Sequence, residues 1–252
     1  MGRDSPKTVN TTGKFLTAEW RDVVMLNYAV DPGLLKKFVP AGTELDLWNG
    51  TAFISLVGFR FLKTKVLGVP ILFHRDFEEV NLRFYVVRRE GSELKRGVAF
   101  LREIVPRWAV ATIARTVYNE KYVALPMSHR IDRNGSGLEA EYAWRSRGQW
   151  SRISLTTSGA AKLPAEGSEE QFIAEHYWGY VAQRDFGCLE YRVDHPSWRV
   201  WTAQGAEFAG DAKELYGQEL AEVLKKKPAS AFLAAGSAVT VYRGRRLPAA
   251  RG

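Results

Sequence analysis

The feature that most constrains the fold is a stretch of strict alternation that follows a two-residue turn. Apolar residues occupy every second position there: Leu138, Ala140, Tyr142 and Trp144. This period of two is typical of a strand with one buried face. Asn134 and Gly135 precede it, and that pair favours the positive φ angles of a type I′ turn. We therefore expect a β-hairpin formed by residues 128–132 and 137–145.

Runs of β-branched and aromatic residues recur along the rest of the chain and predict a mainly β fold. The other candidate strands are residues 52–61, 80–87, 97–104, 109–117, 150–157, 188–195, 199–203 and 238–242. Helices are predicted at residues 31–39, 169–183 and 218–226, the first two with capping residues at Asp31 and Ser168. Many strands with few helices favour a mainly β (α+β) fold, a curved antiparallel sheet or barrel with a few peripheral helices.

Composition excludes several kinds of protein. The 252 residues include one cysteine, Cys188, so the chain has no internal disulfide and no cysteine cage for a metal. No apolar run approaches the ~18 residues of a membrane-spanning helix, and the first residues lack the apolar core of a signal peptide. We expect a cytoplasmic protein with a single domain over residues 1–252, loose at about 1–13 and 247–252.

Charge and histidine spacing limit the partners that we expect. The net charge is +8, but lysine and arginine are spread along the chain in short clusters, which does not favour nucleic acid or a membrane surface. The four histidines lack metal-ligand spacing, so we expect neither a metal nor a cofactor. A homo-oligomer, or an oligomer that binds nucleic acid or acidic partners, stays open as a weaker alternative.

One predicted strand carries a polar face. Alternation places Glu79, Asn81 and Arg83 on one side and apolar residues on the other. A carboxylate, an amide and a guanidinium together can bind a polar ligand or transfer protons. The alternative is a solvated sheet face that carries an ordinary Glu–Arg pair.

Two further groups of residues are candidates for a site. In an extended chain Tyr118, Glu120 and Tyr122 share one face and Arg115 lies on the other, although the segment also fits a solvated loop. His176 lies on the apolar stripe of the predicted helix 169–183, as a core histidine or as a pocket residue. The chain has neither a G-x-S-x-G motif nor a glycine-rich phosphate loop.

A series of segments along nearly the whole chain resembles a known family. The segments are residues 20–32, 77–83, 114–127, 175–178 and 195–198. In this order they resemble the YqjF-like family, domain of unknown function 2071, which is grouped with acetoacetate decarboxylase-like proteins. The resemblance implies a curved β-barrel or cone around a pocket.

The resemblance also implies which catalytic groups are kept. Acetoacetate decarboxylase forms a Schiff base through a lysine of lowered pKa, with an arginine and a glutamate in the pocket. On this chain the glutamate falls on Glu79, the arginine on Ala29, and the paired lysines on Tyr122 and Val123. Lys121 is adjacent, but a shift of one residue in a strand reverses the side chain. The resemblance therefore implies a pocket without the amine nucleophile.

Two functions follow as hypotheses. The first is a pocket that binds a small carboxylate- or carbonyl-bearing molecule, whose anionic group is held by Arg83 or Arg115. Its other ligand-binding residues would be Tyr85, Tyr118, Tyr122 and His176. The second is an enzyme that acts on a small keto or carboxylic acid as a decarboxylase or lyase does, with Glu79 or Glu120 as general acid/base.

Overall fold

The computed structural model describes residues 13–70, 75–106, 122–135, 137–183 and 187–247, and strands dominate them. The strands are β1 (Lys14–Val30), β2 (Glu44–Leu45), β3 (Ala52–Val66), β4 (Val69–Pro70), β5 (Phe77–Glu90), β6 (Glu93–Val105), β7 (Tyr122–Ala124), β8 (Met127–Asn134), β9 (Gly137–Ser146), β10 (Gln149–Thr157), β11 (Trp178–Ala182), β12 (Cys188–Asp194), β13 (Val200–Ala209), β14 (Ser230–Tyr242) and β15 (Arg245–Leu247). The helices are α1 (Pro32–Leu35), a 3₁₀ turn (Lys36–Phe38), α3 (Glu169–Ala174) and α4 (Lys213–Leu224). The expected mainly β fold is confirmed.

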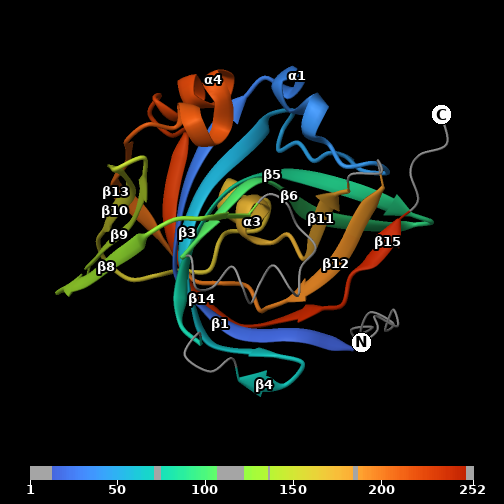
Figure 1. Ribbon diagram of the computed structural model, residues 1–252, viewed down its shortest axis with the longest axis horizontal. Helices are drawn as coiled ribbons and strands as arrows, with labels where there is room; N and C mark the ends of the chain where they lie inside the picture. The colour runs from blue at the N-terminus through green and yellow to red at the C-terminus, as the bar shows by residue number, and fades with distance from the viewer. Residues whose placement is uncertain (1–12, 71–74, 107–121, 136, 184–186, 248–252) are drawn as a thin grey trace.

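The strands of one part of the sheet curl around an interior, and we call them the ring (Figure 1). Their order is β12, β11, β6, β5, β3, β1 and β14. The curl brings β12 back against β14 at two residue pairs, Val193–Val241 and Asp194–Thr240. The expected antiparallel sheet is in fact mixed, because β11 and β7 each pair with β6 in parallel.

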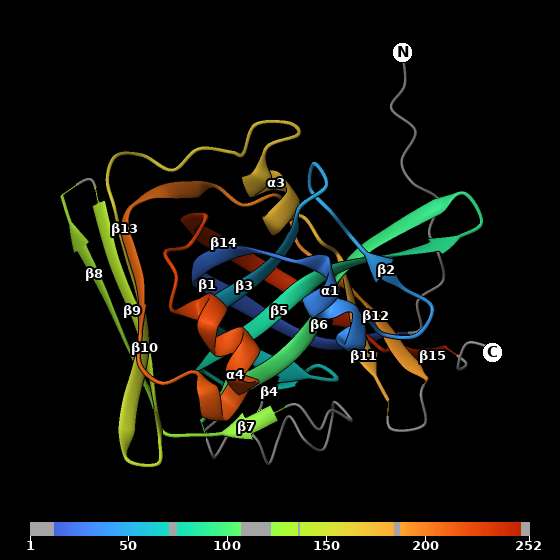
Figure 2. The same cartoon turned by 90° about the horizontal axis from the view of Figure 1, so that it is seen from above.

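A second group of strands extends the sheet beyond β14 and covers one outer face of the ring. It runs β13, β10, β9, β8 and stands to the left in Figures 1 and 2. The predicted hairpin is confirmed, with β8 and β9 joined through Gly135 at a φ of 60°. The alternating apolar residues of β9, among them Tyr142 and Trp144, are buried in the core between the two groups.

The helix predicted over residues 169–183 is wrong beyond Ala174. Its start is confirmed, because the Ser168 side chain accepts a hydrogen bond from the Gln171 amide at 3.2 Å. The chain then forms β11, which pairs with β6 and β12. A Cβ at Gly179 would lie 2.1 Å from Cζ of Tyr191, so the tyrosine ring of β12 packs directly over this glycine and leaves no room for a side chain.

The other helix predictions are confirmed near their expected positions. Asp31 caps α1 by accepting a hydrogen bond from the Gly33 amide at 2.6 Å. The expected helix at 218–226 is the second half of α4, which starts earlier and kinks at Gly217. The strand expected at 109–117 lies outside the described residues. No helix within the described ranges is long and apolar enough to cross a bilayer.

Candidate functional site

The interior of the ring contains a cavity of about 540 Å³. The ring strands supply most of its wall, and Ile173 and Ala174 of α3 add to it from one end of the ring, where α3 lies in Figure 2. Its lining also includes Leu67, which is 55% exposed, so the cavity opens to solvent beside the β3–β4 turn. This size lies within the range of small-molecule sites.

Aromatic side chains form much of the wall. Phe61 stacks on Phe77 with ring centroids 4.6 Å apart, and Trp20 meets Phe59 edge-on at 5.3 Å. Trp198 lies 6.2 Å from Trp20. We call these five residues the aromatic collar, an apolar surface suited to a ring or an alkyl chain.

The polar face of β5 lines the same cavity. Glu79, Asn81 and Arg83 belong to its lining, whereas the alternate residues of β5 pack in the core on the other side. Glu79 is 3% exposed and Asn81 is 2% exposed, so the alternative of a solvated sheet face is wrong. The Asn81 amide donates a hydrogen bond to Oε1 of Glu79 at 2.9 Å.

Burial has a large effect on the Glu79 carboxyl group. Loss of solvent raises the pKa of Glu79 to about 7, although the hydrogen bond from Asn81 and the charge of Arg83 oppose this. At neutral pH the group therefore exists in both protonated and ionised forms. A carboxyl group in this state can donate or accept a proton under physiological conditions.

Arg83 is a cation of the cavity wall whose charge acts on Glu79 but forms no ion pair with it. Its Nη2 lies 3.8 Å from Sδ of Met25, and the guanidinium sits 5.8 Å from the centre of the Tyr85 ring. Its Nε is buried without a hydrogen-bond partner, and it forms no ion pair with any carboxylate of the described ranges. A half-buried guanidinium of this kind favours an anionic ligand.

A β-bulge adds a second carboxyl group that the sequence reasoning missed. Arg83 pairs with Phe100, but Leu82 pairs with Arg102, so Leu101 is an extra residue in β6. Beyond the bulge the odd-numbered side chains of β6 point into the cavity in place of the even-numbered ones, so Glu103 belongs to the cavity lining. Arg102 instead donates from Nε to the Leu215 carbonyl at 3.1 Å on the outer side.

Two tyrosines complete this part of the wall. Tyr122 of β7 pairs with Glu103 in parallel, and Tyr191 comes from β12. Burial raises the pKa of both phenols, and the carboxylates of Glu103 and Glu79 raise it further. Both remain protonated donors at neutral pH. We name the following six residues the polar floor: Glu79, Asn81, Arg83, Glu103, Tyr122 and Tyr191.

His176 and Tyr85 lie mainly behind the wall. The His176 ring packs 4.8 Å from Tyr85, and its Nε2 lies 3.0 Å from Oδ2 of Asp46, which also accepts a hydrogen bond from Arg96 Nε at 2.6 Å. Burial lowers the pKa of His176 while Asp46 opposes the shift. His176 still belongs to the cavity lining, whereas Tyr85 does not; its hydroxyl lies 2.6 Å from Ser55 Oγ.

Several predicted residues cannot be placed in this site. Arg115, Tyr118 and Glu120 lie outside the described residues, as does Lys121, and their roles stay predictions. The described part of the cavity wall contains no lysine. Nor do the described residues include a cluster of histidine, cysteine and acidic side chains that could hold a metal ion.

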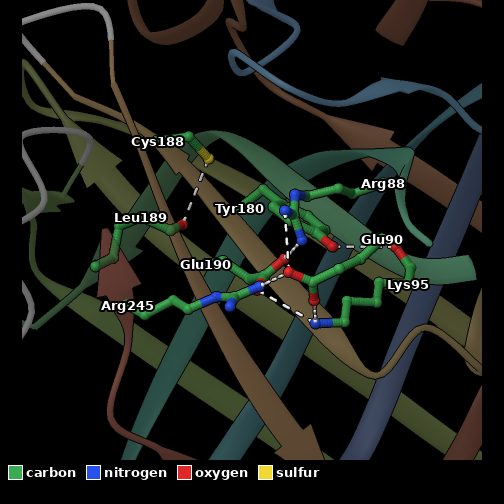
Figure 3. Close-up of polar contacts among 8 residues, drawn as sticks. All are labelled: Arg88, Glu90, Lys95, Tyr180, Cys188, Leu189, Glu190 and Arg245. Carbon is green, nitrogen blue, oxygen red and sulfur yellow. Dashed lines mark hydrogen bonds and ion pairs between the residues drawn. The ribbon is translucent and has the colours of Figure 1, made fainter. Parts of the chain in front are cut away.

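One buried lysine does lie near the cavity, in a network that we call the paired charge cluster (Figure 3). Its members are Arg88, Glu90, Lys95, Glu190 and Arg245, from β5, β6, β12 and β15. Lys95 is 1% exposed; its Nζ contacts Glu90 and lies 3.6 Å from Oε1 of Glu190. Glu190 also accepts hydrogen bonds from Arg88 at 3.1 Å and Arg245 at 2.9 Å. The Lys95 ammonium is thus held by carboxylates outside the cavity wall.

A curved sheet around a ligand-sized cavity is the architecture of acetoacetate decarboxylase-like proteins, and solved structures of that class match the chain. Acetoacetate decarboxylase from Legionella pneumophila is 13% identical with a TM-score of 0.62, over 98% of this chain and 92% of that one. The enduracididine biosynthesis enzyme MppR complexed with pyruvate is 14% identical with a TM-score of 0.63, over 96% of this chain and 93% of that one. At such identities the likeness shows the fold.

Sequence comparison gives the family. A family model described as "uncharacterized conserved protein", DUF2071, matches residues 17–238, and the chain belongs to this family. The protein YqjF of Bacillus subtilis (strain 168) is 27% identical over 190 residues, which cover 75% of this chain and 74% of YqjF. The resemblance found in the sequence is therefore confirmed.

Proposed function

We propose that the cavity binds a small organic acid and that Arg83 anchors the carboxylate of this ligand. The observation that carries the proposal is the Arg83 guanidinium in the cavity wall, which forms no ion pair with any carboxylate of the described residues and whose Nε lacks a hydrogen-bond partner among them. A charge withdrawn from water is costly unless a partner compensates it. A ligand carboxylate would supply that partner through charge-assisted hydrogen bonds.

The rest of the polar floor supports an acid with oxygen functions. Tyr191 offers a phenolic donor, Tyr122 is hydrogen-bonded to Glu103, and Glu79 can become neutral and so avoid repelling the bound anion. The complex of MppR with pyruvate supports a small acid as the kind of ligand that this fold accommodates. We also propose that binding does not involve a Schiff base, because the positions that the family resemblance aligns with the paired lysines are Tyr122 and Val123.

A titration with a panel of acids tests the proposal. Pyruvate, acetoacetate and longer monocarboxylates, each compared with its uncharged amide, are added while the melting temperature and the heat of binding are measured. We expect the acids to raise the melting temperature and the amides not to. Arg83→Met should abolish the effect, whereas Arg89→Met, an exposed arginine on the same strand, should retain it. Equal responses of acids and amides, or binding that survives Arg83→Met, would contradict the proposal.

Catalysis is the second candidate, and the pKa of Glu79 favours it. A carboxyl group that titrates near pH 7 is suited to general acid/base catalysis on a keto or carboxylic acid. Turnover of each bound acid is followed by nuclear magnetic resonance, with Glu79→Gln as the test variant. Loss of turnover with binding kept supports an acid/base role. Turnover that is unchanged in Glu79→Gln rules it out, and mass added after borohydride treatment would reveal a Schiff base.

A further inference from the structure

The cavity has two chemically different parts at different depths. Phe77, Glu79, Asn81 and Arg83 follow one another along the same face of β5. Arg83 is six positions further along the strand than Phe77, and in an extended strand this corresponds to a distance of about 20 Å. The aromatic collar and the arginine of the polar floor therefore lie far apart along one wall.

Strand pairing shows that the other walls are ordered in the same way. Trp20 of β1 pairs with Phe61 of β3, and Phe61 pairs with Phe77 of β5, so these three collar residues are level. Phe59 lies two residues further along β3 toward the floor, where it pairs with Glu79. Met25, which contacts Arg83, is five residues further along β1 than Trp20. Most of the collar thus lies at one level of the cavity and the arginine at another, with Phe59 between them.

The opening lies on the collar side. The exposed lining residue Leu67 directly follows β3, and the half-buried residues Leu16 and Val66 pair with each other just before it. Both strands then lead inward past Trp20 and Phe61. A ligand that enters here meets the collar first and the polar floor last.

We propose that the natural ligand is a monocarboxylic acid with a long apolar body, and that its carboxylate lies on Arg83 while its body fills the aromatic collar. This inference rests on the proposed function, because binding of the carboxylate to Arg83 determines that the apolar end of the acid points toward the collar. A three- or four-carbon acid on Arg83 would not reach the collar. It would leave the apolar wall of a cavity of about 540 Å³ without contact.

A series of straight-chain acids from acetate to hexadecanoate, long enough to span from Arg83 to the collar, tests the inference. Burial of each methylene in the collar should increase affinity about fourfold until the collar is filled. Dissociation constants are measured by calorimetry below the micelle-forming concentration of each acid. The primary alcohols of the same lengths serve as controls and should bind much more weakly, because they cannot pair with Arg83.

A variant of the collar checks where the chain lies. Phe59→Ala should weaken hexadecanoate at least tenfold and leave acetate within twofold. If Phe59→Ala fails to fold, Phe59→Leu replaces it and should weaken the binding of the long acid by a smaller factor. The Arg83→Met variant should weaken acids of every length and leave the alcohols unchanged.

The outcomes separate this inference from the function on which it rests. Affinity that depends on Arg83 but not on chain length would overturn the inference and leave the acid-binding function intact. Affinity that rises with length but is equal for acids and alcohols would overturn both, because the carboxylate would then play no part. Rising affinity with dependence on Arg83 and on Phe59 supports both.

Discussion

The paired charge cluster and the polar floor lie on opposite faces of the same strands. On β12, Glu190 faces outward into the cluster and the next residue, Tyr191, faces the cavity. On β5, Arg88 belongs to the cluster and Arg83 to the floor. Each cation of the cluster has a carboxylate within ion-pair distance (Figure 3), whereas Arg83 has none in the described ranges. The difference indicates that the cluster stabilises the sheet and that the floor is arranged to receive a ligand.

The largest expected effect is on the cluster. Glu190→Ala should lower the free energy of unfolding by about 3–5 kcal/mol, because it leaves Lys95 buried with one partner fewer. Urea denaturation measures the change. Glu207→Ala, which removes an exposed carboxylate on β13, is the control and should cost little. A loss below about 1 kcal/mol at Glu190 would show that the network contributes little to stability.

The next effect concerns the protonation of Glu79. Its pKa is about 7 in the folded protein and 4.5 when unperturbed, so the folded state holds a proton that the unfolded chain has released between these values. Folding stability therefore falls as the pH rises through this window, by about 3 kcal/mol in total. Glu79→Gln removes this penalty. Relative to wild type, the variant should gain about that amount between pH 4 and pH 8 in denaturation experiments. A difference that is constant across this range would contradict the raised pKa.

A direct comparison of two arginines comes third. Without ligand, Arg83→Met should change the free energy of unfolding by no more than about 1 kcal/mol, because it removes an unpaired charge together with weak contacts to Met25 and Tyr85. Arg88→Met on the same strand should cost more, because Glu90 and Glu190 both lose a partner. Equal losses in thermal unfolding would remove the distinction between the two faces.

The smallest effect calibrates the others. Lys37 and Glu219 form an ion pair at 2.5 Å, but both side chains are exposed. Glu219→Gln should therefore change stability by less than about 1 kcal/mol, and added salt should weaken even that effect. A larger loss would mean that simple burial does not separate the strong pairs from the weak ones in this protein.

The alternation of apolar and polar residues predicted most of the strands and the hairpin. It also predicted which side chains of β5 share a face. The facing alone did not distinguish a solvated surface from a cavity wall at Glu79, because that depends on how the sheet curls. Residues 175–183 were misassigned since their aromatic spacing fits both a helix stripe and a strand. The backbone partners on β6 and β12 decide between these structures, and they lie far away in the sequence. Glu103 was missed because alternation cannot reveal a bulge.

The bulge at Leu101 has a consequence for the charge of the interior. Arg102 and Glu103 are neighbours of opposite sign, and one extra residue determines which of them faces inward. Were β6 to pair without the bulge, an arginine would replace the glutamate within unchanged walls. The preference of such an interior for anions or cations is thus set by strand registry as well as by side-chain identity, and an insertion or deletion can reverse it where no substitution has occurred.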